Sequence, residues 1–288
     1  MTRNHSHRRR GTLLALAALA VFGFVLAPAR TGDADDAPLP GAPRDTADIS
    51  AGVERADSSS TEIVPAPAEP IRAGESLRFS VQYGPIKAGT AWLEIPQVVD
   101  WNGHRAFSLV ARAESNGFFS AFYKVRNRIE SVWDVDGRFS WHYRENRREG
   151  GYRVSNEITF DRDSLQARWP DGQTYPIPRD VQDALSSFYY TRCLALPLGR
   201  SVWFDYHASR KSVPLEVKVL GRQKIKTPAG TFQCIAIEPY LKAGGVFKNK
   251  GRLVIWLTED DRRMPVLMRS YLTIGSISVV LQEVKNGG

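Results

Sequence analysis

The chain has 288 residues and a formal net charge of +8, from 39 Lys and Arg against 31 Asp and Glu. A basic balance suits nucleic acid, but no nucleic-acid-binding motif accompanies it, so the charge points to other anionic partners. No catalytic motif stands out either, and the functional interpretation therefore rests on compartment, charge and fold.

The first 29 residues have the form of a secretory signal peptide. Residues 8–10 are arginines, residues 12–26 are an almost unbroken apolar run, and Ala27-Pro28-Ala29 supplies small residues where signal peptidase cuts. The apolar run of about 15 residues is shorter than the ~20 that span a bilayer as a helix. We predict an exported, periplasmic protein with cleavage near Ala29, and an uncleaved N-terminal anchor is the alternative.

Residues 30–69 are predicted to be a disordered linker, because they are rich in Ala, Pro, Asp and Ser and almost free of aromatic residues. The linker carries 3 basic and 9 acidic residues, whereas residues 70–288 carry 32 and 22, a net of +10. This favours anionic envelope partners such as phospholipid head groups, lipopolysaccharide or peptidoglycan. Scattered Lys and Arg that only confer solubility are an equal alternative.

From residue 70 onwards the chain alternates like a series of β-strands. In residues 77–83 every second side chain is apolar, which is the period of a sheet with one face in water. Turn-forming residues separate the further candidates. The predicted strands of this half are 77–83, 90–99, 105–114, 123–134, 138–147, 152–161 and 164–169.

Residues 180–196 predict the one long helix of the domain. Asp180 suits the N-cap, and Asp183 adds a second acid to the first turn, where the helix dipole favours it. Pro197 ends the helix. Asp183 and Arg192 are expected to bond the sheet structurally rather than to act in catalysis. The apolar stripe at helical spacing is Val181, Leu185, Phe188, Tyr189, Cys193 and Leu196.

Strands resume after the helix, and the predicted ranges are 201–208, 213–226, 230–240, 250–259, 264–274 and 276–285. Short connections between successive strands mean antiparallel pairing. The predicted fold is therefore mainly β: a large curved antiparallel sheet or half-barrel of about 10–13 strands, with helix 180–196 packed on it. It forms a single domain over residues 70–288, and the sequence does not say whether the sheet closes into a barrel.

The sequence predicts no catalytic, metal or cofactor site. The three histidines of the domain stand on separate elements, without a partner at metal-ligand spacing. Asp134-Val135-Asp136-Gly137 begins like a calcium loop, but the later oxygen ligands are missing and a hairpin turn is favoured. Cys193 and Cys234 can pair in an oxidising compartment, and two separate buried thiols are an equal alternative.

Aromatic residues are the more suggestive feature. The cluster at residues 118–123 is interpreted as a buried edge or short helical turn of the core, with an exposed loop tip that touches a membrane as the alternative. A curved sheet with a single helical cover would leave an apolar hollow between them. The predicted ligand-binding residues are Tyr83, Trp133, Phe188 and Tyr189 in this cavity and Lys87 and Arg192 near its rim.

Five separated blocks resemble, in the right order, a bacterial family of exported proteins called domain of unknown function 3108. The blocks are GESLRFSVQYGPIKAGTA (74–91), QDALSSFYYTR (182–192), TPAGTFQC (227–234), IWLTEDDRRMPVLM (255–268) and IGSISVVL (274–281). The resemblance implies an exported, β-rich envelope protein, and it brings no activity or functional residue. The layout is also similar to the half-barrels of periplasmic lipoprotein carriers and their outer-membrane receptor, but fold does not fix function.

Three functions follow from the sequence, in this order of preference. The first is non-enzymatic binding of a lipid or other amphiphile in the half-barrel, with a possible peripheral membrane contact. The second is an envelope structural or assembly factor that contacts peptidoglycan or an outer-membrane partner. The third is a hydrolase, which would bring two carboxylates about 5–10 Å apart in a polar cleft.

Overall fold

The structure, a computed structural model, describes residues 62–243, 246–247, 252–272 and 275–285. These residues form one sheet of 16 strands, a second sheet of two strands and two short helices. The large sheet contains β2 (Glu75–Tyr83), β3 (Ile86–Ile95), β4 (Val98–Trp101), β5 (His104–Ser115), β6 (Val125–Asp134), β7 (Ser140–Glu149), β8 (Tyr152–Asp161), β9 (Gln166–Arg168), β10 (Thr174–Pro176), β12 (Ser201–Ala208), β13 (Lys211–Thr227), β14 (Gly230–Ala243), β15 (Val246–Phe247), β16 (Arg252–Thr258), β17 (Pro265–Leu272) and β18 (Gly275–Lys285). The other elements are β1 (Ile63–Val64), β11 (Leu196–Pro197), α2 (Gly117–Ser120) and α3 (Ser186–Arg192).

Two halves of the chain meet in the middle of the large sheet. β18 pairs with β2, which places Leu281 opposite Phe79. From this pair the strands run in chain order to β10 on one side and in reverse order to β12 on the other. Within the described residues, β10 and β12 do not pair, so the sheet is open. The predicted mainly-β, antiparallel fold is confirmed, but the sheet has 16 strands instead of the predicted number of about 10–13, because several short strands extend it.

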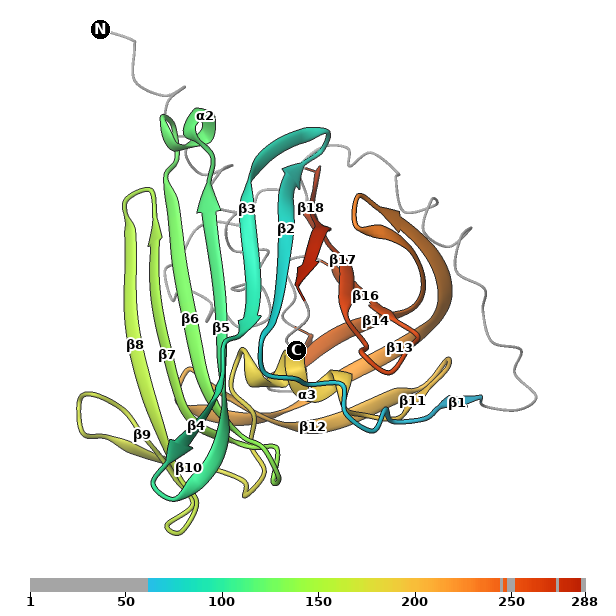
Figure 1. Ribbon diagram of the computed structural model, residues 1–288. Helices are drawn as coiled ribbons and strands as arrows, with labels where there is room; N and C mark the ends of the chain where they lie inside the picture. Colours follow the sequence, from blue (N-terminus) through green and yellow to red (C-terminus); the bar gives the residue numbers. More distant parts are fainter. Residues whose placement is uncertain (1–61, 244–245, 248–251, 273–274, 286–288) are drawn as a thin grey trace, which may run out of the picture.

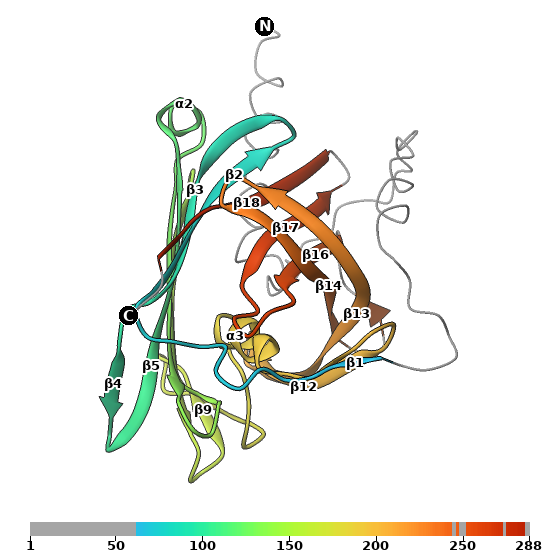
Figure 2. The same cartoon turned by 45° about the vertical axis from the view of Figure 1, so that its right-hand side comes forward.

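The open sheet is strongly curved (Figures 1 and 2). In Figure 1, β2, β3 and β5 to β8 stand side by side as one wall, while β13 and β14 sweep round to β12, which passes close to α3. The turned view of Figure 2 places α3 on the concave side of the sheet. The helix therefore lies between the two halves that the sheet brings together.

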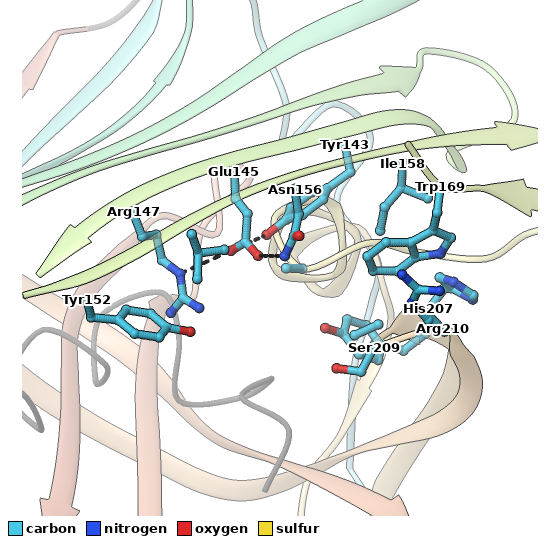
Figure 3. Close-up of a pocket in the computed structure, with 14 residues that line it drawn as sticks. Tyr143, Glu145, Arg147, Tyr152, Asn156, Ile158, Trp169, His207, Ser209 and Arg210 are labelled. Atoms are coloured by element: carbon cyan, nitrogen blue, oxygen red, sulfur yellow. Dashed lines mark hydrogen bonds and ion pairs between the residues drawn. The ribbon is translucent and has the colours of Figure 1, made fainter. Parts of the chain in front are cut away.

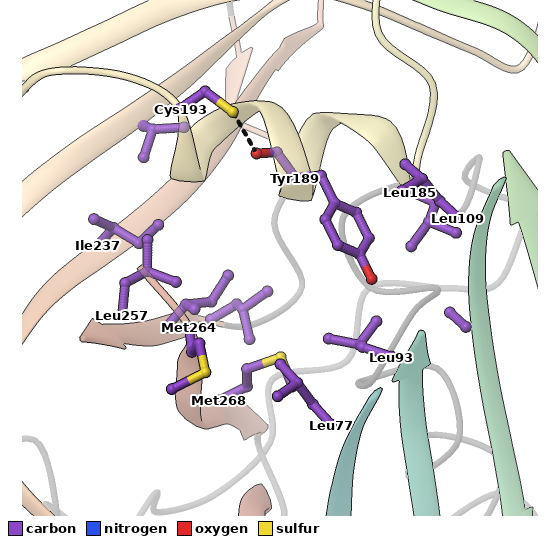
Figure 4. Close-up of a cluster of buried hydrophobic side chains, with 14 of the residues drawn as sticks. Leu77, Leu93, Leu109, Leu185, Tyr189, Cys193, Ile237, Leu257, Met264 and Met268 are labelled. Carbon is purple, nitrogen blue, oxygen red and sulfur yellow. Dashed lines mark hydrogen bonds between the residues drawn. The ribbon is translucent and has the colours of Figure 1, made fainter. Parts of the chain in front are cut away.

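Apolar side chains from both halves pack against α3. Tyr189 is fully buried, and in Figure 4 its ring extends from the helix toward the strands. Full burial of a large apolar side chain stabilises a fold by roughly 1.5–3 kcal/mol, so this cluster fixes the helix to the sheet. Its other labelled members are Leu77, Leu93, Leu109, Leu185, Cys193, Ile237, Leu257, Met264 and Met268.

The predicted long helix at 180–196 is wrong, because α3 spans only Ser186–Arg192. The residues before it bond neighbouring strands: Gln182 N donates to Asp205 O at 2.9 Å, and His207 N donates to Gln182 O at 2.8 Å. After the helix, Leu196 pairs with Val64 of β1. The apolar stripe is buried as its spacing indicates, except for Phe188, which is half-buried, but pairing with strands takes the backbone at both ends out of the helix.

Asp183 nonetheless stands at the start of the helix. Its Oδ1 accepts hydrogen bonds from Leu185 N at 2.7 Å and Ser186 N at 2.8 Å, and its Oδ2 accepts one from Ser131 Oγ of β6 at 2.5 Å. The expectation that Asp183 bonds the sheet is confirmed. The predicted N-cap at Asp180 is wrong, since that residue lies outside the helix.

Three further expectations can be compared with the structure. Cys193 and Cys234 are both free and buried, and burial raises the pKa of the Cys234 thiol to about 12. The cluster at residues 118–123 overlaps the short helix α2, but Phe118 and Phe122 are exposed, so the core interpretation is wrong. No helix in the described part of the chain is long and apolar enough to cross a membrane. The predicted signal peptide, 1–29, lies outside the described residues.

Candidate functional site

In the described residues, the two edges of the open sheet come into contact near the turn between β12 and β13. The turn between β12 and β13 reaches the hairpin of β9 and β10, where Arg210 Nη2 lies 2.6 Å from Asp171 Oδ2. We call this contact the seam. Beside it lies a partly open cavity of about 410 Å³, the seam pocket (Figure 3). This volume lies within the range of small-molecule sites, roughly 300–1,000 Å³.

The pleat of β7 and β8 builds one wall of the seam pocket, because alternate side chains of a strand share a face. The strand register sets Glu145 opposite Asn156 and Tyr143 opposite Ile158. This wall consists of Tyr143, Glu145, Arg147, Tyr152, Val154, Asn156 and Ile158. The facing wall comes from the end of β12 and its turn, with Tyr206, His207, Ala208, Ser209 and Arg210, while Trp169 of the β9–β10 hairpin and Ala184, which precedes α3, complete the lining. The pocket therefore forms only because β12 curves back toward strands that are distant from it in the sheet.

Glu145 is the centre of a polar cluster on the β7–β8 wall. Its carboxylate accepts hydrogen bonds from Asn156 Nδ2 at 2.7 Å and from Tyr143 OH at 3.2 Å, and Arg147 Nε lies 3.1 Å from Oε2. The Arg147 guanidinium also lies 5.7 Å from the centre of the Tyr152 ring. Burial, together with the Glu145 carboxylate, raises the pKa of Tyr143 well above its ordinary value, so that its hydroxyl remains a donor.

Arg210 fixes the other end of the pocket. Its Nη1 donates to Gln173 Oε1 and Tyr175 OH, both at 2.9 Å, and its guanidinium lies 5.1 Å from the centre of the Trp169 ring. The turn is strained, because φ is 51° at Ser209 and 67° at Arg210, where two-residue hairpins normally place Asn and Gly. Strain of this kind persists where surrounding contacts hold it, and it is frequent at functional sites.

Apart from Arg147 Nε, which is ion-paired with Glu145, three buried polar atoms beside the pocket have no hydrogen-bond partner in the described part of the chain. They are Trp169 Nε1, Tyr206 OH and His207 Nε2, and the last two residues are each only 1% exposed. Burial raises the pKa of Tyr206 and lowers the pKa of His207 to about 4, so both are neutral at pH 7. Since buried polar groups in native proteins are nearly always paired, water or a bound molecule in the pocket would complete the hydrogen bonding of these atoms.

The three atoms offer both hydrogen-bond donors and an acceptor. Ser212 Oγ donates to Pro176 O at 3.4 Å and lies 3.0 Å from His207 Nδ1. With its hydrogen directed to the carbonyl, the serine accepts from Nδ1–H, which leaves His207 Nε2 as an acceptor. Trp169 Nε1 is a donor and Tyr206 OH is both, so the set suits a ligand group that carries hydroxyls.

The pocket does not bring two carboxylates together. Glu145 is the one carboxylate among its fourteen lining residues, and three neighbours already bind it. Glycoside hydrolysis by the common route requires two such groups, and the lining of this pocket supplies one. In the described ranges, no group of three or more His, Cys, Asp or Glu residues is arranged to hold a metal ion.

The six ligand-binding residues predicted from the sequence do not line the seam pocket, and four of them gather near α3. The Tyr189 ring centre lies 6.0 Å from that of Phe188, and the Arg192 guanidinium lies 5.3 Å from the Tyr189 ring. Trp133 is buried and donates Nε1 to Gln182 Oε1 at 3.0 Å. Arg192 is fully buried and bonds Glu75 of β2 at 2.7 Å, which confirms its expected bond to the sheet.

The other two predicted residues lie at the opposite end of the sheet. Tyr83 ends β2 and is half-buried, while Lys87 lies near the start of β3 and is exposed. The fold therefore does not bring Tyr83 and Lys87 to α3. Ligand binding by these six residues stays a prediction.

The sequence analysis missed the residues of the seam pocket, although one signal for them exists. Residues Tyr143, Glu145 and Arg147 in β7 share a face, and this face carries polar and aromatic side chains where a core strand would carry aliphatic ones. Polar residues on an inward face are informative. The sequence could not show which face of β7 turns inward, nor that β12 returns to cover it.

Comparison with known proteins agrees with this fold. The family model described as "Protein of unknown function (DUF3108)" matches residues 78–282, most of the described domain. No curated protein matches the chain. These comparisons identify a family but carry no activity to the seam pocket.

Three solved structures are similar to the chain at low sequence identity. A β-barrel-like protein of domain of unknown function DUF1849 from Brucella abortus has a TM-score of 0.50 and 9% identity, and covers 76% of this chain and 100% of its own. A protein described as exported, with a YmcC-like fold, from Bacteroides fragilis covers 77% and 100% at 14% identity, with a TM-score of 0.31. A protein described as a lipoprotein, from Parabacteroides distasonis, covers 77% and 99% at 11% identity, also with a TM-score of 0.31. The first likeness supports the barrel-like fold alone.

Proposed function

Because the chain belongs to the DUF3108 family of proteins of unknown function, we propose a function from its own residues: it is an exported, non-enzymatic envelope protein that binds an amphiphile in the seam pocket. The observation that carries this proposal is one cavity of about 410 Å³ whose walls combine aromatic rings with fixed polar groups. Export rests on the signal-like residues 1–29.

The two kinds of lining residue divide the work of binding. The rings of Tyr143, Tyr152 and Trp169 supply apolar surface, which drives the transfer of an acyl or other apolar group out of water. The polar groups fix the orientation of the ligand, as in most small-molecule sites. A ligand with both an apolar part and a hydroxyl-bearing or anionic head matches this division, and a purely apolar one would leave the polar groups unpaired at a cost.

The polar part of the ligand has two places to bind. Arg147 and Arg210 line opposite walls, and a guanidinium can hold a phosphate or carboxylate with two parallel hydrogen bonds. The unpaired atoms of Tyr206 and His207 lie on the same wall as Arg210. A ligand head with hydroxyl groups next to an anionic group would pair with the arginines and with the unpaired atoms of Tyr206 and His207. Envelope phospholipids and lipopolysaccharide carry such heads on apolar chains.

The test is native mass spectrometry, with lipid extraction, of the full chain purified from its own envelope. We expect an added mass that organic solvent removes. The variant Ala208→Trp fills the pocket from β12 and should lose this mass, whereas Ala195→Trp, at an exposed position outside the pocket, should keep it. Thermal unfolding of both variants confirms that they fold.

Two outcomes would argue against amphiphile binding. One is a protein that carries no added mass and takes up none when mixed with envelope lipid extract. The other is an added mass that Ala208→Trp retains in full, because the ligand would then lie elsewhere. Salt-sensitive binding of a ligand-free protein to isolated sacculi would favour the alternative function, a structural factor at the peptidoglycan.

A further inference from the structure

We propose that one end of the sheet is a docking surface for an anionic lipid bilayer. Three hairpin tips meet there, because successive strands from β2 to β8 are antiparallel neighbours. We call residues 83–89, 114–126 and 148–153 the tip surface. Figure 1 shows these tips, including α2, at the end of the wall that lies away from α3. The proposal does not depend on what the seam pocket binds.

The tip surface gathers exposed apolar side chains. The described part of the chain has seven exposed large hydrophobic residues, and four of them, Ile86, Phe118, Phe122 and Tyr152, lie on the tip surface. Phe118 and Phe122 are the most exposed of the seven, at 69% and 70%. Single exposed apolar residues are ordinary, but such a concentration at one end marks an interaction site.

A rigid loop holds the two phenylalanines outward. Asn116 caps α2 by accepting a hydrogen bond from Phe119 N at 2.9 Å, and its Nδ2 donates to Lys87 O at 2.7 Å. The second bond ties the loop to the β2–β3 tip. The rings of Phe118 and Phe122 pack edge to face, 5.6 Å apart. Their exposure is thus a property of a hydrogen-bonded loop and not of a loose one.

The third tip, between β7 and β8, packs against the β5–β6 loop through a glycine. Gly150 N donates to Lys124 O at 2.8 Å, and Gly150 has a φ of 57°. A Cβ at this position would lie 2.5 Å from the Tyr123 ring, so a glycine is required for the β7–β8 tip to pack here. The three tips therefore present one continuous surface.

The positive charge of the tip surface indicates an anionic partner. The tip surface has one exposed acidic residue, Glu114. Its exposed basic residues are Lys87, Lys124, Arg126, Arg148 and Arg153. Glu149, the other acid in these ranges, is buried. Lys and Arg close to an anionic leaflet are attracted to it, and their aliphatic stems lie along the apolar part of the interface.

The combination of protruding rings and a cationic surround matches a bilayer better than a protein partner. Rings that reach the boundary between head groups and acyl chains bury apolar surface, while the cations stay among the lipid phosphates. Tyr152 belongs both to the tip surface and to the lining of the seam pocket. A docked bilayer would therefore lie next to one end of the pocket.

The test is flotation of the full chain with vesicles of phosphatidylcholine alone and of phosphatidylcholine mixed with phosphatidylglycerol. We expect binding to the anionic vesicles that weakens at high salt. The double variant Phe118→Ser/Phe122→Ser should bind them about tenfold less, because two exposed rings no longer enter the interface. The double variant Lys87→Glu/Lys124→Glu should lose most of its preference for anionic over neutral vesicles.

Matched controls come from the other end of the molecule. Trp203→Ser removes an exposed aromatic side chain of β12, and Lys211→Glu reverses a charge beside the β12–β13 turn. Both should bind vesicles like the unchanged chain. Every variant keeps residues 1–61, so their contribution cancels in the comparison. The proposal is overturned if the tip variants bind as well as the unchanged chain, or if the controls lose as much binding as they do.

Discussion

Two arginine–carboxylate contacts, one in the core and one at the seam, have the same chemistry in opposite surroundings. In the core, Arg192 binds both oxygens of Glu75, at 2.7 and 2.9 Å, and both side chains are 0% exposed. At the seam, Arg210 binds Asp171 at 2.6 Å, and each side chain is 40% exposed. The difference lies in the surroundings, because the first pair is sealed in the fold and the second borders a cavity.

The core pair is a structural clamp. Arg192 Nη2 also donates to Pro70 O at 2.9 Å and Arg262 O at 3.0 Å, so it joins α3 to the start of β2 and to the loop before β17. Burial by itself would raise the pKa of Glu75, but the guanidinium groups of Arg192 and Arg262 outweigh it, and the pKa is lowered. Glu75 therefore stays ionised, and the pair holds α3 to the sheet from inside the core.

Removal of one partner from the core clamp should have the largest effect. In Arg192→Leu the buried Glu75 carboxylate loses its bidentate partner, and we expect the free energy of unfolding to fall by about 3–5 kcal/mol. Urea unfolding measures this change. Arg78→Leu is the matched control, because Arg78 pairs with Glu283 at the surface and its loss should lower stability by less than about 1 kcal/mol. Equal losses in the two variants would mean that burial does not separate the two classes of ion pair.

His207 tests how far the seam is shielded from water. Burial lowers its pKa to about 4, from 6.5 for a free histidine. As the pH falls below 6.5 the unfolded chain takes up a proton that the folded chain does not, so stability falls with pH until it reaches about 4. Between these two pH values the histidine should lower the free energy of unfolding by on the order of 3 kcal/mol. Urea unfolding at about pH 7.5 and about pH 4.5 should show it, since the window is set by the two pKa values.

The control for this pH dependence is His207→Gln, which has no group that titrates in that window. The difference in unfolding free energy between the two pH values should be smaller in this variant by the histidine contribution. An identical pH dependence in both proteins would show that the His207 side chain is solvated in the folded state. Water would then reach the seam pocket freely, as it reaches an ordinary part of a protein surface.

The sequence predicted strands well because each strand carries its own signal. The alternation of Leu77 and Phe79 with polar neighbours identified β2, and a helical stripe identified the buried side of α3. The prediction from the sequence was wrong at the ends of α3, where the backbone at Gln182 bonds to β12. Such bonds join segments distant in sequence, and no local pattern reveals them.

The sequence analysis did not predict the seam pocket, for the same reason. Its two main walls come from β7–β8 and from the end of β12, and their approach depends on the curvature of the whole sheet. Arg192 and Arg210 are equivalent as residue types, and only burial distinguishes a clamp from a residue beside a cavity. The sequence offered no means to tell the buried arginine from the one beside the cavity.

The smallest effect on stability is expected at the seam contact itself. Arg210→Lys keeps the positive charge but loses the flat guanidinium that binds Asp171 and lies over the Trp169 ring. Because the pair is exposed, the free energy of unfolding should change less than in either experiment above. Amide hydrogen exchange should nevertheless become faster in β10 and near the end of β12, since the contact between the two edges is weakened.

Arg269→Lys provides the comparison for this last change, because Arg269 donates to Ser278 in the middle of the sheet, away from the seam. Its exchange pattern at β10 and β12 should match that of the unchanged chain. If Arg210→Lys also leaves exchange at both edges unaltered, the contact does not hold the edges together, and the shape of the pocket must come from the curvature of the sheet alone. If exchange increases only there, the exposed pair controls the opening of the pocket while the buried clamp controls the stability of the fold.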